Sequence, residues 1–89
     1  MTILIAEDTA FQRDYLRKLI SVEFSEHLPV IEVEDGLQAV EMSEKSEPAL
    51  VVLDIKLPRL NGIKAARAIW DKLPLTRIVF WSQYKDETY

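Results

Sequence analysis

Leu50-Val51-Val52-Leu53, an apolar run without polar alternation, leads into Asp54 in this 89-residue sequence. The absence of alternation is typical of a strand that is covered on both faces, as strands in parallel sheets are. We therefore predict a buried strand over Leu50–Ile55.

Three further apolar runs have strand character, and they lie at Ile3–Ala6, Val30–Val33 and Ile78–Trp81. The last is β-branched and aromatic, a composition that favours strands. In the second, Glu32 and Glu34 alternate with apolar residues, which predicts an edge strand with one solvent-exposed face.

The segments between these runs have helical periodicity. In the first, apolar side chains recur on one side of a helix, at Phe11, Tyr15, Leu16, Leu19 and Ile20. Thr9 and Gln12 match a capping box, which predicts that this helix begins near Ala10.

Two more helices are predicted further along the chain. Asp35 is placed to cap a short second helix whose apolar residues are Leu37, Ala39 and Val40. A third helix follows Asn61-Gly62, with apolar residues at Ile63, Ala66, Ile69, Trp70 and Leu73.

This alternation of strands and helices predicts an α/β domain with a parallel sheet and helices on both faces. Ligands of such sheets bind at the carboxyl ends of the strands, near the point where the strand order reverses. The residues that end each strand are therefore the candidates for a functional site.

Acidic residues end two of the predicted strands. Glu7 and Asp8 follow the first strand, and Asp54 ends the third. If these strands are neighbours, the carboxylates meet at one edge, where two of them 4–5 Å apart repel by about 3–4 kcal/mol at an effective dielectric of 20. A hard divalent cation such as Mg²⁺ would relieve this repulsion.

A carboxylate beside such a cation can act as a nucleophile toward phosphorus and form an aspartyl-phosphate. Asp54 is the best candidate, because its loop continues through Pro58 and Asn61-Gly62 into a new helix. Ser82, at the end of the fourth predicted strand, would donate a hydrogen bond to a phosphoryl oxygen there.

Composition excludes several other classes of function. The chain has 11 Lys and Arg against 15 Asp and Glu, a net charge of −4 that argues against nucleic-acid binding by this segment. It has no cysteine and a single histidine, which excludes disulfides, thiolate zinc sites and multi-histidine metal sites. No apolar run approaches the roughly 20 residues of a membrane span, so we expect a cytoplasmic protein with no membrane partner.

Together these residues resemble the receiver domain of two-component response regulators. The resemblance covers the whole chain, and it is carried by the Ile3–Asp8 segment, Val52–Pro58, Asn61-Gly62 and Ile78–Ser82. It implies a flavodoxin-like, doubly wound parallel sheet with strand order 2-1-3-4 over residues 1–89.

The resemblance also implies roles for individual residues. Asp54 would accept a phosphoryl group from a histidine kinase, while Asp8, Asp54 and the backbone carbonyl of Lys56 bind Mg²⁺. Glu7 would assist through a water molecule, and Ser82 would be the switch hydroxyl. The domain would not be an enzyme but a phosphoacceptor that controls an output domain or effector outside this chain, with transcriptional control as the expected output.

The sequence departs from the family pattern at its C-terminal end. Family members continue into a fifth strand and a fifth helix, and the strand supplies a lysine to the phosphoryl site. We therefore expect a C-terminally incomplete receiver domain. Its fourth strand would be an unprotected edge, which favours a dimer or another association through that edge.

Two other classes of function stay open. The first is a receiver-like interaction module or fragment without phosphotransfer chemistry, which the missing fifth strand favours. The second is an enzyme of similar architecture. The acidic turn Glu7–Ala10 argues against a flavin protein, and Lys56 stands where a haloacid-dehalogenase-type phosphatase has its second acid.

Overall fold

Parallel strands and helices alternate along the chain in the computed structural model, which describes residues 1–23 and 28–81. Within these residues the elements are β1 (Ile3–Ala6), α1 (Ala10–Glu23), β2 (Val30–Val33), α2 (Gly36–Ser46), β3 (Leu50–Asp54), α3 (Gly62–Lys72) and β4 (Arg77–Trp81). The predicted strands and helices are all present. The third strand ends one residue earlier than expected, and the fourth begins one residue earlier.

The four strands form one parallel sheet in the order β2-β1-β3-β4. This order confirms the prediction and makes β1 and β3 direct neighbours, with Ala6 opposite Leu53. Asp54 lies opposite Trp81 on the next strand. The residues that follow β1 and end β3 therefore emerge side by side at one edge.

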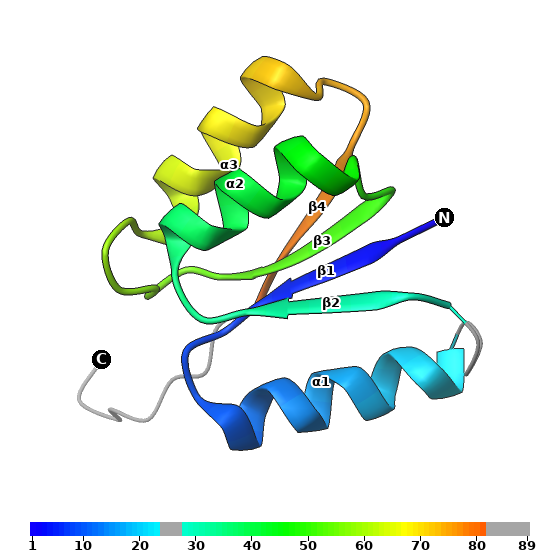
Figure 1. Cartoon of the computed structure of the whole chain (residues 1–89). Helices are drawn as coiled ribbons and strands as arrows, with labels where there is room; N and C mark the ends of the chain where they lie inside the picture. Colours follow the sequence, from blue (N-terminus) through cyan, green and yellow to red (C-terminus); the bar gives the residue numbers. More distant parts are fainter. Residues whose placement is uncertain (24–27, 82–89) are drawn as a thin grey trace.

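Helices cover both faces of the sheet (Figure 1), with α2 and α3 on one side and α1 on the other. The sheet has a hydrophobic core on each face, and alternate residues of β1 pack into one or the other. Leu4 and Ala6 pack beneath α2 and α3, while Ile3 and Ile5 face α1. All four are fully buried. Each large apolar side chain buried in this way contributes roughly 1.5–3 kcal/mol, so β1 is firmly held just before the acidic pair.

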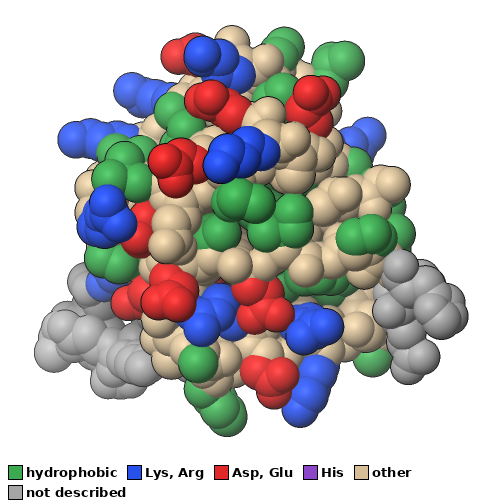
Figure 2. All heavy atoms as spheres, viewed as in Figure 1, with side chains coloured by type: hydrophobic (Ala, Val, Ile, Leu, Met, Phe, Trp, Pro, Cys, Tyr) green, Lys and Arg blue, Asp and Glu red, His purple; other side chains and the backbone are tan. Residues whose placement is uncertain are grey.

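The strand β2 lies at an edge of the sheet, as predicted, but α1 covers most of the face that bears Glu32, and in this strand only Glu32 is exposed. Glu32 on that face forms ion pairs with Arg13 at 3.5 Å and Arg17 at 3.4 Å, both on α1. Figure 2 shows acidic and basic side chains beside one another on this side of the molecule. The N–H of Glu34 donates to Oε1 of Gln38 at 2.8 Å, which protects the end of this open edge from pairing with another chain.

Polar caps start two of the helices. Oδ1 of Asp35 accepts the N–H of Gln38 at 2.8 Å, which confirms the predicted cap of α2. Asn61 caps α3 in the same way, through the N–H of Lys64 at 2.9 Å. Each such cap typically stabilises a helix by about 1 kcal/mol.

The apolar stripes of α1 and α3 are only partly buried. On α1 the structure buries Leu16 and Ile20, whereas Phe11 is 75% exposed and Tyr15 and Leu19 are also exposed. On α3, the predicted stripe residues Ile63 and Trp70 are exposed, and the fully buried Ala65 was not predicted. Helical periodicity identifies an apolar side of a helix but not how much of that side its neighbours cover.

At the other edge of the described sheet, β4 pairs only with β3, and the side chains of Val79 and Phe80 are exposed. Association through this strand stays a prediction. None of the helices in residues 1–23 and 28–81 is long and apolar enough to cross a membrane.

Candidate functional site

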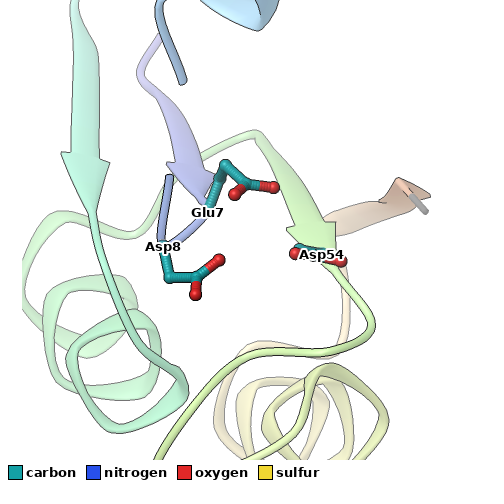
Figure 3. Close-up of side chains that lie close together, drawn as sticks. All are labelled: Glu7, Asp8 and Asp54. Atoms are coloured by element: carbon teal, nitrogen blue, oxygen red, sulfur yellow. The ribbon is translucent and has the colours of Figure 1, made fainter. Parts of the chain in front are cut away.

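Three carboxylates meet at the carboxyl end of the sheet. Glu7 and Asp8 follow β1, Asp54 ends β3, and one oxygen from each lies within 4.8 Å of the others. Figure 3 shows the three side chains gathered around one space between the two strand ends. The structure thus brings together the acids that the sequence placed at neighbouring strand ends, and we call this group the acidic cup.

The first two acids differ in exposure, although their carboxylates lie close together. Glu7 continues β1 into the interior and is only 3% exposed, while Asp8 is exposed. Oε2 of Glu7 accepts the N–H of Thr9 at 2.7 Å. The main chain of Glu7 is held as well, by its N–H to the Val33 carbonyl and by Arg13, which donates to the Glu7 carbonyl at 2.8 Å.

Asp54 is partly buried, and the loop that follows it holds its side chain. Oδ1 of Asp54 accepts the N–H of Lys56 at 3.1 Å. The two ends of this loop are joined at the start of α3, where the N–H of Gly62 donates to the Ile55 carbonyl at 2.8 Å. A Cβ at Gly62 would lie 2.1 Å from the Asp54 carbonyl oxygen, so only glycine permits this approach.

The electrostatics of the acidic cup are unfavourable without a cation. The pKa of Glu7 is raised from 4.5 to about 7, chiefly by burial and also by Asp54 and Asp8, against the lowering effect of the Thr9 N–H. In the part of the chain that the structure describes, lysine and arginine side chains form ion pairs with Asp14, Glu32 and Asp35 and not with the three acids of the cup. An all-oxygen donor set with uncompensated charge fits a hard divalent cation.

The raised pKa of Glu7 predicts a pH-dependent stability in metal-free solution. Because the folded state binds the Glu7 proton more tightly than the unfolded chain, this contribution is complete below about pH 4.5 and is lost as the pH rises through about 7. We expect the free energy of unfolding to fall over this window by no more than about 3 kcal/mol. Urea denaturation at several pH values, in a chelating buffer, measures it.

Glu7→Gln is the control, since the amide keeps a hydrogen-bond acceptor for the Thr9 N–H but does not titrate. The difference between the two pH profiles isolates Glu7 from other groups that titrate in this range. Parallel profiles would show that the proton of Glu7 is not retained in the folded state.

Two other predicted site residues have a less complete structural description. Lys56 is exposed, and its N–H binds Asp54, but the role of its backbone carbonyl as a metal ligand stays a prediction. Ser82 lies outside the described residues.

Sequence reasoning missed the structural role of the glycines. The chain has only two, Gly36 and Gly62, and each begins a helix that packs against the loop after Asp54. Their scarcity, with one directly after a capping Asp and the other directly after a capping Asn, was the available signal.

Comparison with known proteins agrees with this geometry. A family model described as "Response regulator receiver domain" matches residues 3–89. The transcriptional regulatory protein DegU of Brevibacillus brevis is 32% identical over 87 residues, a match that covers 98% of this chain and 36% of that protein. PdtaR of Mycobacterium tuberculosis, another transcriptional regulatory protein, is 41% identical over 83 residues, covering 91% of this chain and 40% of that protein.

Solved structures show the same similarity. The response regulator domain of Thermotoga maritima CheB aligns with a TM-score of 0.81 and 32% identity, over 99% of this chain and 64% of that one. A two-component transcriptional regulator from Clostridium phytofermentans aligns with a TM-score of 0.83 and 28% identity, over 100% of this chain and 72% of that one. The chain spans less than half the length of the curated relatives named above.

Proposed function

This chain belongs to the family of response regulator receiver domains, and from that premise we propose that Asp54 accepts a phosphoryl group from a histidine kinase. The observation that carries the proposal is the acidic cup, in which Asp54 lies beside Glu7 and Asp8 at the carboxyl end of the sheet. Because the receiver is a phosphoacceptor, we propose a switch and not an enzyme that turns over a substrate.

We propose Mg²⁺ as the cation of the acidic cup. Asp8, Asp54 and the Lys56 carbonyl would hold it, and Glu7 would contribute through a water molecule. When bound, Mg²⁺ would neutralise the negative charge that otherwise repels a phosphoryl donor.

The proposed attack on phosphorus would use one oxygen of the Asp54 side chain. The Lys56 N–H holds Oδ1, which leaves Oδ2 as the oxygen that would form the new bond to phosphorus. In this transfer the bond between phosphorus and the kinase histidine nitrogen breaks, and the electron pair of that bond stays with the nitrogen. A hydrogen bond from Ser82 to the phosphoryl group stays a prediction.

The partners follow from the family. We propose a histidine kinase as donor and an output domain or effector outside residues 1–89 as receiver of the signal. Relatives include transcriptional regulators and protein-glutamate methylesterases, and for this chain we propose transcriptional control, without direct DNA contact by this acidic segment. The cytoplasmic location and the C-terminal incompleteness stay predictions.

Phosphorylation by a small donor tests the proposal. Incubation with acetyl phosphate and Mg²⁺ is expected to add one phosphoryl group, detected as an intact-mass increase and located at Asp54 by peptide mapping. Asp54→Asn should abolish the adduct, because the amide is not a nucleophile toward phosphorus.

Asp14→Asn, an exposed acid on α1, is the matched control and should be phosphorylated like the wild type. An adduct that persists in Asp54→Asn, or no adduct on the wild-type chain under conditions in which it is folded, would contradict the assignment of Asp54.

A further inference from the structure

The loop after Asp54 is attached to the start of α2. This loop, residues 55–61, leads from β3 to α3, and the N–H of Gly36 donates to the Pro58 carbonyl at 3.2 Å. A Cβ at Gly36 would lie 1.8 Å from the Leu60 carbonyl oxygen. The main chains of α2 and the loop are therefore in direct contact, without a side chain between them.

Arg59 sits at the centre of a tight turn in this contact. Its φ is 68°, in the left-handed region that residues with a Cβ rarely adopt. The Leu60 N–H donates to the Pro58 carbonyl at 2.7 Å, which closes a three-residue γ-turn around Arg59. Such a conformation is energetically costly and persists only where the surrounding structure holds it.

The side chain of Asp35 holds this turn. Its two oxygens have different partners, since Oδ1 caps α2 through the Gln38 N–H and Oδ2 accepts from Nη1 of Arg59 at 3.2 Å. The Asp35 side chain is only 9% exposed, whereas that of Arg59 is 61% exposed. A carboxylate this buried requires charged or hydrogen-bonded partners, and without Arg59 the Gln38 N–H would be the one partner of Asp35 that remains among these contacts.

We propose that Asp35 and Arg59 are positioning residues, which hold the loop after Asp54 in place for the Mg²⁺ and phosphoryl site. This inference rests on the proposed function. Arg59 follows Lys56 by three residues, and the Lys56 main chain binds Asp54 through its N–H and would bind the metal through its carbonyl. The loop is anchored at Gly62 on one side and, on the other, by the Gly36–Pro58 hydrogen bond and the Asp35–Arg59 pair. Loss of the ion pair loosens the second attachment and so shifts the Lys56 carbonyl from the position in which it would bind the metal.

Mg²⁺ titration of the 89-residue chain by calorimetry tests this inference. Arg59→Gln and Asp35→Asn are each expected to weaken Mg²⁺ binding by about two- to fivefold, the range of a partly exposed ion pair. Asparagine still caps a helix, so Asp35→Asn keeps α2 intact. The double variant should bind no more weakly than the weaker single variant, because both substitutions remove the same interaction.

Two further variants test whether the effect on Mg²⁺ binding comes from positioning of the loop, from the charge of Arg59 or from the loss of any surface ion pair. Lys18→Gln removes the ion pair of Lys18 with Asp14 on α1, at 3.1 Å, and should leave Mg²⁺ affinity unchanged. Arg59→Lys keeps the charge and should recover part of the affinity that Arg59→Gln loses. In the metal-free protein, the amide NMR signal of Lys56 should shift in Arg59→Gln and stay in place in Lys18→Gln.

The possible outcomes distinguish this inference from the proposed function. Wild-type affinity in folded Arg59→Gln and Asp35→Asn overturns the inference but leaves the proposed function intact. If the wild-type chain does not bind Mg²⁺, or binds it as tightly as Asp54→Asn does, both the inference and the proposed function are overturned. If Asp35→Asn does not fold, Arg59→Gln still decides the question, because its side chain is largely in solvent and caps no helix.

Discussion

Asp8→Asn is expected to weaken Mg²⁺ binding by roughly 100-fold, equivalent to about 3 kcal/mol. Asp8 is the exposed member of the acidic cup and supplies one of the carboxylate oxygens that lie within 4.8 Å of one another. A unit charge pair 4 Å apart interacts by about 4 kcal/mol at an effective dielectric of 20, and the interaction with a divalent ion is larger. An asparagine oxygen keeps part of the ligation, which limits the loss. Calorimetric titration at neutral pH measures it.

The same substitution should not destabilise the metal-free fold. Removing one of three adjacent carboxylates relieves repulsion, so the unfolding midpoint without Mg²⁺ should stay the same or rise. Asp71→Asn, an exposed acid on α3, is the matched control and should keep wild-type affinity. Equal affinity of Asp8→Asn and Asp71→Asn would show that the acidic cup is not the metal site. A receiver-like interaction module without phosphotransfer chemistry would then be the better description.

Gly62→Ala is expected to lower the free energy of unfolding by about 2–3 kcal/mol, as overpacking of a closely packed site does. The added Cβ would lie 2.1 Å from the Asp54 carbonyl oxygen and 2.9 Å from the Ile55 Cα. Both are main-chain atoms, so they can move only if β3 or α3 is displaced. The better helix propensity of alanine, worth about 1 kcal/mol, opposes this loss but is smaller. Urea denaturation measures the net effect.

The substitution should also reduce Mg²⁺ affinity, because the clash moves the residue that carries the acceptor carboxylate. Lys64→Ala, at an exposed position of the same first turn of α3, is the control and should cost little stability. A Gly62→Ala protein as stable as the wild type would mean that α3 can shift without disturbing the end of β3.

The sequence predicted the secondary structure and the acids at the strand ends, and the reason is local. Residues 50–53 could be assigned to a buried strand because every side chain in the run is apolar. Asp35 could be assigned as a cap because a short polar side chain directly before a helical pattern is strongly preferred at the N-cap position. The position of Asp54 at a strand end required no long-range information.

Other features of the site depended on contacts between residues far apart in the sequence. The burial of Glu7 but not Asp8 depends on what packs around the end of β1. The ion pair of Asp35 with Arg59 joins residues 24 positions apart, and neither residue type nor spacing predicts it. The exposure of Phe11, Tyr15 and Leu19 likewise reflects which neighbours cover α1.

By itself, then, the sequence determined where strands and helices form, which residues end the strands and that acids would gather at one edge of a parallel sheet. These properties follow from side-chain periodicity and backbone preference, which act within a few residues. Only the tertiary structure decided which acid is buried, which glycines admit a neighbouring main chain and which arginine anchors the loop after Asp54. Those properties depend on distances across the fold, which side-chain periodicity and backbone preference within a few residues do not specify.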